Sequence, residues 1–398
     1  MPELSKAKKA TQFIFLVCGL GLSSWAPMVP FAKDRLLLDD AELGLLLLLL
    51  GLGAIMMMPL SGIILNKIGS RKVIALGSFI IALTLPLLVV ISSNAGMAVA
   101  LFAFGCGIGM VDVAMNTHGV QVQNLYGKPI MSSLHGLFSV GGLLGSLGLG
   151  LLMKIGLDPL FAAICVSIAL IIIVLSQYKH LFNQKFEKQT IEKFTLRDGP
   201  VKAKNSFQWM DARVLLLGFM SFSIFLSEGA VLDWSALLLR DIKNTMPEFA
   251  GAGFATFSVA MAMMRLAGDK ILLILNRRIV VVGGCLVAVA GILLIIFSSW
   301  LAVILLGFLL IGIGAANTVP VFFSEGGRIP AISPTISISA ISTMGYAGQL
   351  TGPALLGYVA HHYSLQMAFG CVGLLFLIVA GIYSVRKMIN HQPHKIPL

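Results

Sequence analysis

Residues 104–123 read FGCGIGMVDVAMNTHGVQVQ and follow the apolar run AGMAVALFA. On an α-helix of 3.6 residues per turn, five small or polar residues of this segment share one stripe. They are Gly105, Asp112, Asn116, Gly119 and Gln123. An ionised carboxylate in the middle of a bilayer costs about 3 kcal/mol on insertion scales, so it normally faces protein or a water-filled cavity. Asp112 therefore predicts a cavity inside a membrane protein; the alternative is a structural carboxylate bonded to a neighbouring helix.

The composition is typical of an integral membrane protein. Of the 398 residues, 58% are hydrophobic and 11% are charged, and the mean hydropathy is +0.95, whereas soluble proteins have about 25% charged residues. The apolar runs are long enough for helices that cross a hydrocarbon core of about 30 Å, and they lack the alternation of barrel strands. We therefore expect an all-α integral membrane fold with twelve transmembrane helices.

The cysteines and the net charge exclude several other classes. Each cysteine stands alone in its own apolar run, without CxxC spacing, so neither disulfides nor a zinc site are predicted, and no metal or other cofactor is expected. These residues are Cys18, Cys106, Cys165, Cys285 and Cys371. The net charge of +11 comes from basic residues spread over short loops. Because nucleic-acid sites gather such residues in one patch, no nucleic-acid partner is expected.

The apolar segments divide the chain into two halves. We expect helices at residues 11–31, 43–66, 72–92, 97–123, 131–153, 158–178, 212–239, 249–275, 279–298, 301–323, 334–359 and 365–387. Six belong to an N-terminal half at 1–178 and six to a C-terminal half at 212–398. The polar stretch 179–211 mixes Lys with Glu and contains Gly199 and Pro200, which predicts an amphipathic cytoplasmic linker on the lipid surface.

The two halves carry an internal repeat. Gly62 matches Gly268 and Gly142 matches Gly348 at the same separation along the chain. Two six-helix bundles related by an axis along the membrane normal are one arrangement of secondary transporters, which bind substrate between the repeats near the midplane. The alternative is a chance match of scattered glycines.

The basic residues favour one orientation in the membrane. With both termini in the cytoplasm, most of the 28 Lys and Arg residues lie in cytoplasmic segments, as the positive-inside rule requires. The external ones are Lys33, Arg35, Lys154, Arg240 and Lys243. We expect a multi-pass protein of a cell membrane, most simply a bacterial inner membrane, with both termini cytoplasmic.

A glycine-containing basic segment ends the second predicted helix. Residues 62–72 read GIILNKIGSRK, which resembles the signature of the major facilitator superfamily, although Asn66 stands where that family usually has Asp. The resemblance implies a conformational latch between helix ends, with a degenerate copy, RLAGDK, at 265–270. The alternative is that the basic residues only set the topology. The latch candidates are Gly62, Asn66, Lys67, Gly69, Arg71, Lys72, Arg265 and Asp269.

Further segments resemble one group within this superfamily. They are VDVAMNTHG at 111–119, KPIMSSLHGLFSVGG at 128–142, SEGAVLDWS at 227–235, RLAGDK at 265–270 and GYAGQLTGP at 345–353. The group is the rhizopine-transporter-like one, which lies near the fucose permeases. The resemblance implies a sugar, cyclitol or related polyol as substrate, and the two intramembrane carboxylates would also suit an amine.

In this superfamily helices 1, 4, 7 and 10 line the central cavity, so the resemblance indicates which polar residues to consider. The proton-coupling candidates are Asp112 and Glu228; fucose permeases also have an acidic residue on helix 1, which this chain lacks. The substrate-cavity candidates are Trp25, Asn116, Asp233, Trp234, Asn317 and Gln349. Trp25 and Trp234 are equally typical of interfacial anchors, and Gln349 of packing.

Several of these polar residues also have structural interpretations. The alternative for Glu228 is a buried ion pair with Arg265, and Arg265 is also one turn from Asp269. His118 and His135 lie near the cytoplasmic ends of their segments, which favours hydrogen-bonded structural roles over a proton relay.

These observations predict a secondary active transporter. It would move a small polar solute by alternating access, coupled to protons, with membrane lipid as its surroundings and a monomer as the expected state. No sequence of the form GxxxxGK followed by Ser or Thr is present to support ATP-driven transport. The alternatives are a proton-driven exporter of drugs or metabolites and a non-transporting membrane receptor.

Overall fold

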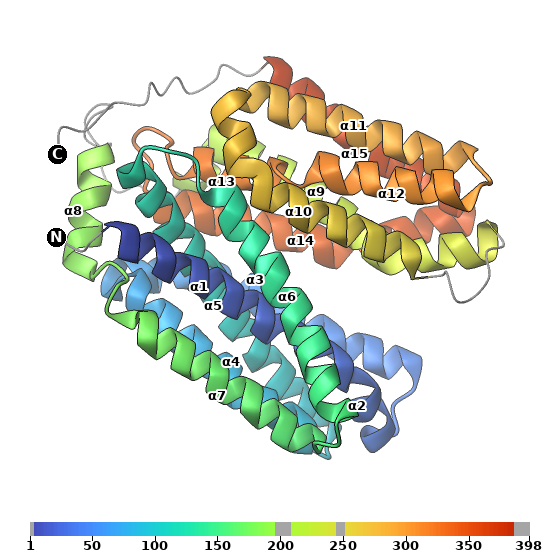
Figure 1. The fold of residues 1–398 in the computed structure, drawn as a ribbon, viewed down its shortest axis with the longest axis horizontal. Helices are drawn as coiled ribbons and strands as arrows, with labels where there is room; N and C mark the ends of the chain where they lie inside the picture. The colour runs from blue at the N-terminus through green and yellow to red at the C-terminus, as the bar shows by residue number, and fades with distance from the viewer. Residues whose placement is uncertain (1–3, 196–207, 244–250, 386–398) are drawn as a thin grey trace. The chain divides into compact units, whose positions relative to one another are not determined.

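The computed structural model describes residues 4–195, 208–243 and 251–385, and all of its long elements are helices (Figure 1). These helices group into two compact units. The first unit contains α1 (Leu4–Ser23), η1 (Ala26–Met28), α2 (Val29–Leu36), α3 (Asp40–Ile68), α4 (Ser70–Val90), α5 (Asn94–Tyr126), α7 (Pro159–Tyr178) and α8 (Gln184–Thr195). The second contains α9 (Ala212–Leu237), η4 (Leu238–Ile242), α10 (Ala252–Ile274), α11 (Arg277–Phe297), α12 (Leu301–Ala315), α13 (Thr318–Gly326) and α15 (Leu365–Val385).

Two helices are shared between the units. The helix α6 (Met131–Lys154) begins in the second unit, which includes residues 127–136, and continues in the first. The helix α14 (Pro334–His362) begins in the first unit, which includes residues 327–343, and continues in the second. The division into halves at 1–178 and 212–398 therefore stays a prediction, based on the internal repeat. The compact units differ from these halves at the starts of α6 and α14.

The prediction of twelve transmembrane helices is confirmed. Ten segments in the described part of the chain are long and apolar enough to cross a membrane; α1, η1 and α2 form one of them, and α12 and α13 form another. The remaining two helices are α10, which carries Arg265, Asp269 and Lys270, and α14, which is rich in Ser, Thr and Gly. Their polar residues lower the hydropathy without shortening the helices.

Local sequence explains where several helices begin and break. Pro27 and Pro30 interrupt the first span, because proline has no N–H to donate within a helix. Asp39 and Glu42 form a reciprocal capping box at the start of α3. Gly69 has φ of 84° between α3 and α4, a conformation that favours glycine, so the two helices can follow each other without a longer loop.

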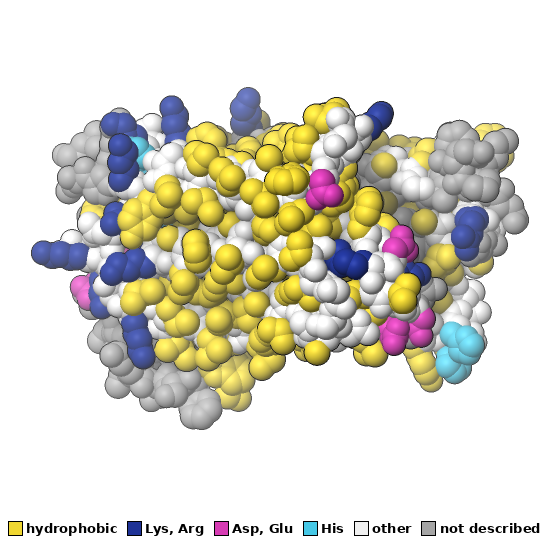
Figure 2. Space-filling model, turned by 90° about the horizontal axis from the view of Figure 1, so that it is seen from below, with side chains coloured by type: hydrophobic (Ala, Val, Ile, Leu, Met, Phe, Trp, Pro, Cys, Tyr) yellow, Lys and Arg dark blue, Asp and Glu magenta, His cyan; other side chains and the backbone are white. Residues whose placement is uncertain are grey.

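The interior of the first unit is organised around α5. This helix packs against α1, α3 and α4, and almost every side chain of residues 104–123 is buried. Hydrophobic side chains instead face outward on many helices, as Figure 2 shows for one face; Leu147 and Leu175, for example, are 70% and 65% exposed. In a membrane protein such surfaces contact lipid, so they need no protein partner.

Candidate functional site

Asp112 lies at the centre of a buried polar cluster in the first unit. Its side chain is on α5 and is only 6% exposed. The Asn116 side-chain amide, one turn along, donates to the Asp112 main-chain oxygen at 2.9 Å and approaches its Oδ1 at 3.4 Å. The Ser342 hydroxyl on α14 donates to Asp112 Oδ2 at 2.9 Å. The carboxylate therefore has polar partners from two helices that are far apart in sequence.

Hydrogen bonds at several points hold the segment that carries Ser342 in this unit. Besides the bond to Asp112, the Ser339 hydroxyl donates to the Met58 main-chain oxygen at 2.6 Å, and Arg328 Nε donates to Asn124 Oδ1 at 2.6 Å. A Cβ atom on Gly62 would lie only 3.1 Å from Ser339 Oγ. Glycine at this position thus lets α3 approach the start of α14 closely.

Glu228 and Arg265 form an ion pair in the second unit. Arg265 Nη2 lies 2.8 Å from Glu228 Oε1, with side-chain exposures of 8% and 17% respectively. Arg265 Nε also donates to the Ala316 main-chain oxygen at 3.2 Å. The structure thus shows the ion pair that was the structural alternative for Glu228. Arg265 binds this carboxylate of α9.

Asp269 contacts a helix start. Its Oδ1 accepts a hydrogen bond of 3.2 Å from the Ser133 amide in the first turn of α6, where the partial positive charge of a helix favours an anion. A Cβ atom on the neighbouring Gly268 would lie 2.6 Å from Ser132 Cβ. Gly268 and Gly62 therefore have the same role in their respective units, each allowing close approach to the start of a shared helix.

Asn317 lies beside this contact. Its side-chain Nδ2 donates to the Met264 main-chain oxygen at 3.2 Å, while its buried Oδ1 has no hydrogen-bond partner among the described residues. A Cβ atom on Gly268 would collide with this oxygen, so the Asn317 side chain packs against Gly268 in this structure.

The loop between α3 and α4 is fixed by the linker helix α8. Glu187 of α8 is 2% exposed, and its carboxylate accepts hydrogen bonds from the Ser70 amide at 2.8 Å and from Gln121 Nε2 at 2.9 Å. Burial raises the pKa of Glu187, while these hydrogen bonds counter that rise. The Gln184 side chain donates to the Lys67 main-chain oxygen. The amphipathic linker is therefore helical at Gln184–Thr195, and residues 196–207 lie outside the described part of the chain.

The histidines have structural environments. The Phe182 amide donates to His118 Nε2 at 3.0 Å, and His118 Nδ1 lies 2.9 Å from the Thr11 hydroxyl. Because that hydroxyl donates to the Ala7 main-chain oxygen, this network assigns the proton to Nδ1 of a neutral ring. His135 packs near the Phe323 ring with centroids 5.5 Å apart. Both observations favour the structural interpretation.

The other cavity candidates are less closely connected. Trp25 is 5% exposed, and its indole nitrogen and that of Trp234 have no hydrogen-bond partner among the described residues. Asp233 and Gln349 are exposed. Trp25 and Asn116 belong to the first unit and the remaining candidates to the second. Contacts within either unit therefore do not bring all six predicted cavity residues together.

Sequence reasoning missed three polar residues with buried contacts. Ser342 gave no signal, because its partner Asp112 is on another helix. Glu187 did give a sequence signal, because it is a charged residue on the apolar stripe of α8, four residues before Ile191. Glu325 accepts a hydrogen bond of 2.6 Å from the Tyr383 hydroxyl, and both side chains are buried.

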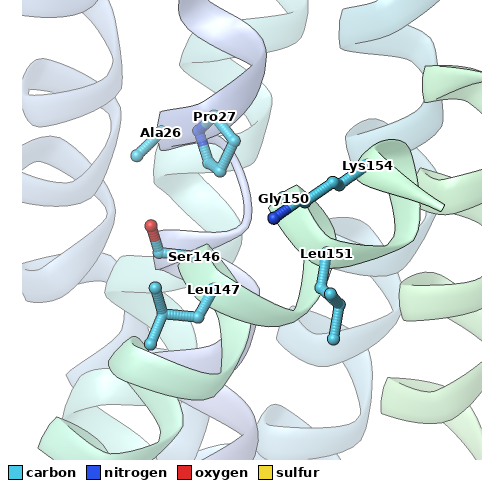
Figure 3. A pocket seen from close by; sticks show the side chains of 7 residues that line it. All are labelled: Ala26, Pro27, Ser146, Leu147, Gly150, Leu151 and Lys154. Carbon is cyan, nitrogen blue, oxygen red and sulfur yellow. The ribbon is translucent and has the colours of Figure 1, made fainter.

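One surface hollow in the first unit is not the predicted site. It has a volume of about 560 Å³ and is lined by Ala26, Pro27, Ser146, Leu147, Gly150, Leu151 and Lys154 (Figure 3). Leu147 and Leu151 are 70% and 59% exposed, so the hollow opens on a lipid-facing surface. Among the described residues, no group of three or more His, Cys, Asp or Glu side chains is placed to hold a metal ion.

The helical architecture and the lipid-facing apolar surfaces define a polytopic membrane protein. Residues 12–326 match the sequence profile of the Major Facilitator Superfamily, and the chain belongs to this family. It is 42% identical to an uncharacterized MFS-type transporter of Yersinia pestis over 94% of each chain. It is 30% identical to the membrane protein MosC of Rhizobium meliloti, over 97% of this chain and 90% of that protein.

Solved structures share the fold. The fucose:proton symporter FucP of E. coli superposes with a TM-score of 0.74 at 16% identity, covering 96% of this chain and 98% of that one. The proton:xylose symporter XylE gives a TM-score of 0.76 at 13% identity, covering 95% and 94%. The predicted family and group are confirmed, and since the family consists of transporters, the chain is a transporter and not an enzyme.

Arg71→Ala should slow the conformational cycle more than it weakens solute binding. The Arg71 guanidinium lies 4.2 Å from the centroid of the Tyr178 ring at the end of α7, and such a pair contributes about 0.5–1 kcal/mol at an exposed site. We expect the transport rate to fall several-fold while the equilibrium dissociation constant stays nearly unchanged. Solute uptake and solute binding by the same preparation measure the two quantities; a large loss of affinity at a normal rate would contradict the latch.

Proposed function

We propose that the chain carries a small polar solute across the bacterial inner membrane by alternating access, in symport with protons. The solute class is a sugar, cyclitol or related polyol. Asp112 takes up and releases the proton, Asn116 one turn along the same helix is a polar ligand for solute hydroxyls, and the Glu228–Arg265 pair stabilises the second unit.

The contact between Asp112 and Ser342 is the observation that supports this proposal most. A buried carboxylate is costly when ionised unless hydrogen bonds compensate, so closing a cavity around it favours the neutral form. Ser342 can donate to the ionised group or accept from the protonated one, because a hydroxyl does both. Proton occupancy is then linked to whether the α5–α14 contact is formed, as alternating access with proton coupling requires.

The solute class is supported by the sequence group and by the kind of polar atoms available. FucP is a fucose:proton symporter and XylE is a proton:xylose symporter. Because their sequence identities to this chain are low, the similarity to them is evidence for the fold alone. A side-chain amide such as that of Asn116 is suited to binding hydroxyl groups, because it offers both a donor and an acceptor.

A ligand screen followed by transport measurements tests the function. Purified protein is screened by thermal shift against sugars, cyclitols, polyols, amines and lipophilic cations. Compounds that stabilise it are then followed in proteoliposomes with and without a pH gradient. Uptake of a polyol that depends on an inwardly directed proton gradient supports the proposal. Extrusion of lipophilic cations instead would favour the exporter, and the absence of any flux would exclude both.

The orientation is a separate prediction. Since basic residues gather in the loops assigned to the cytoplasm, reporter fusions after Asn94 and after Gly199 should report opposite sides, with Gly199 and both termini cytoplasmic. An alkaline phosphatase reporter is active only outside the cytoplasm and a fluorescent-protein reporter only inside, so each fusion is read twice. Both positions on one side would contradict the twelve-helix topology as oriented.

A further inference from the structure

A second hollow lies where the α3–α4 loop meets the start of α8, within the first unit. It has a volume of about 250 Å³ and is lined by Ile68, Arg71, Lys72, Asn183, Gln184 and Lys185. Three of these six residues are cationic and none is acidic. The carboxylate nearest in sequence, Glu187, is buried and does not line the hollow.

The walls of this hollow are held in place. On one side, Gln184 is bonded to the Lys67 main-chain oxygen and Glu187 to the Ser70 amide. On the other, the Arg71 guanidinium is stacked over the Tyr178 ring. Asn183 Oδ1 accepts from the Phe186 amide at 2.9 Å and so fixes the first turn of α8. The cations are therefore presented by anchored backbone and not by a free loop.

The position of the hollow along the spans indicates the lipid headgroup region. The candidate spans Glu42–Ile68, Ser70–Val90 and Pro159–Tyr178 each have one end at this point. Ends of membrane spans lie at the boundary between the hydrocarbon core and water. The lining matches that boundary, with apolar Ile68 beside charged Arg71 and Lys72.

We propose that this hollow binds the phosphate group of an anionic phospholipid. Basic pockets beside transmembrane helices are suited to anionic headgroups, and each nearby Lys or Arg contributes to attraction to an anionic membrane surface. Arg71 can hold phosphate oxygens in the plane of its guanidinium while Lys72 and Lys185 act as point charges. A bound headgroup joins the linker helix to the α3–α4 loop, the segment that contains the latch candidates.

Lipid binding by full-length protein tests this site. Protein purified in neutral detergent receives one of three additions: mixed micelles containing phosphatidylglycerol, mixed micelles containing phosphatidylcholine, or inorganic phosphate. Thermal unfolding and native mass spectrometry then report stabilisation and retained lipid. We expect phosphatidylglycerol, and neither of the other two additions, to stabilise the wild type and to be retained. Equal stabilisation by inorganic phosphate would overturn the lipid assignment.

Two pairs of substitutions separate a specific site from general attraction. Lys72→Gln with Lys185→Gln should reduce retained phosphatidylglycerol at least twofold and remove most of the stabilisation. Arg277→Gln with Arg278→Gln removes the same charge from the start of α11 and should change neither. If both pairs lose lipid equally, or the first pair loses none, the hollow is not a specific site. Lys185→Gln alone, at an exposed position of α8, gives the same readout if the first pair does not fold.

Discussion

Proteoliposomes containing Asp112→Asn should exchange solute at a rate near that of the wild type but fail to concentrate it when a pH gradient is imposed. Asparagine has almost the same volume as a protonated aspartate, and its Oδ1 can still accept the Ser342 hydroxyl that bonds Asp112 at 2.9 Å. It cannot release a proton. The solute should therefore equilibrate across the membrane, and solute-induced alkalinisation of the medium should be lost.

Ser342 provides the matched comparison for this experiment. Ser342→Ala removes a hydrogen bond to a charged group, worth about 1.5–3 kcal/mol, but leaves the carboxyl group and its proton. We expect it to shift the pH dependence of uptake without abolishing accumulation. Thr343→Ala, next in the same helix, removes a bond to the Ser339 main-chain oxygen and should leave the pH dependence unchanged. Accumulation by Asp112→Asn with wild-type pH dependence would show that another group carries the proton.

Replacing one member of the Glu228–Arg265 pair should destabilise the protein more than replacing both. Breaking a buried ion pair by removing one partner costs about 3–5 kcal/mol, because the other charge is left without compensation. We therefore expect Glu228→Gln and Arg265→Gln each to lower the thermal unfolding temperature in detergent clearly, and the double variant to recover most of the loss. Asp233→Asn, an exposed carboxylate in the same helix, should have little effect.

The same variants separate the two roles considered for Glu228. A stable double variant that still accumulates solute with a pH gradient would assign Glu228 to structure alone. A stable double variant that exchanges solute without accumulating it would make Glu228 a second proton carrier. A double variant that loses as much stability as the two single variants together would show that the two charges do not stabilise each other.

Much of the fold could be predicted because a membrane imposes length and hydropathy on each helix. The twelve expected segments correspond to the observed helices, and Pro27 and Pro30 mark the interruption of the first. What hydropathy could not predict is which unit a helix start joins. The starts of α6 and α14 pack according to contacts such as Gly268 with Ser132 and Gly62 with Ser339, which depend on three-dimensional approach.

The candidate site was predictable where a residue contradicts its own surroundings. Asp112, Glu228 and Arg265 stand out because charges are rare in apolar segments. Their hydrogen-bond partners were harder to predict, because a serine such as Ser342 is common in membrane helices and gives no signal until its neighbour is known. Glu187 was predictable in part: the sequence places it on an apolar stripe, but it does not indicate the hydrogen bond to the Ser70 amide.

The sharing of α14 has a consequence for biosynthesis. Ser342 follows Asp112 by 230 residues, so at about 5–20 residues per second the ribosome adds it roughly 10–50 s later. Throughout that interval Asp112, Asn124 and the Met58 carbonyl lack the partners that residues 327–343 supply. An N-terminal fragment ending before residue 327 is thus an incomplete folding unit, and assembly of the first unit must wait for translation of most of the second.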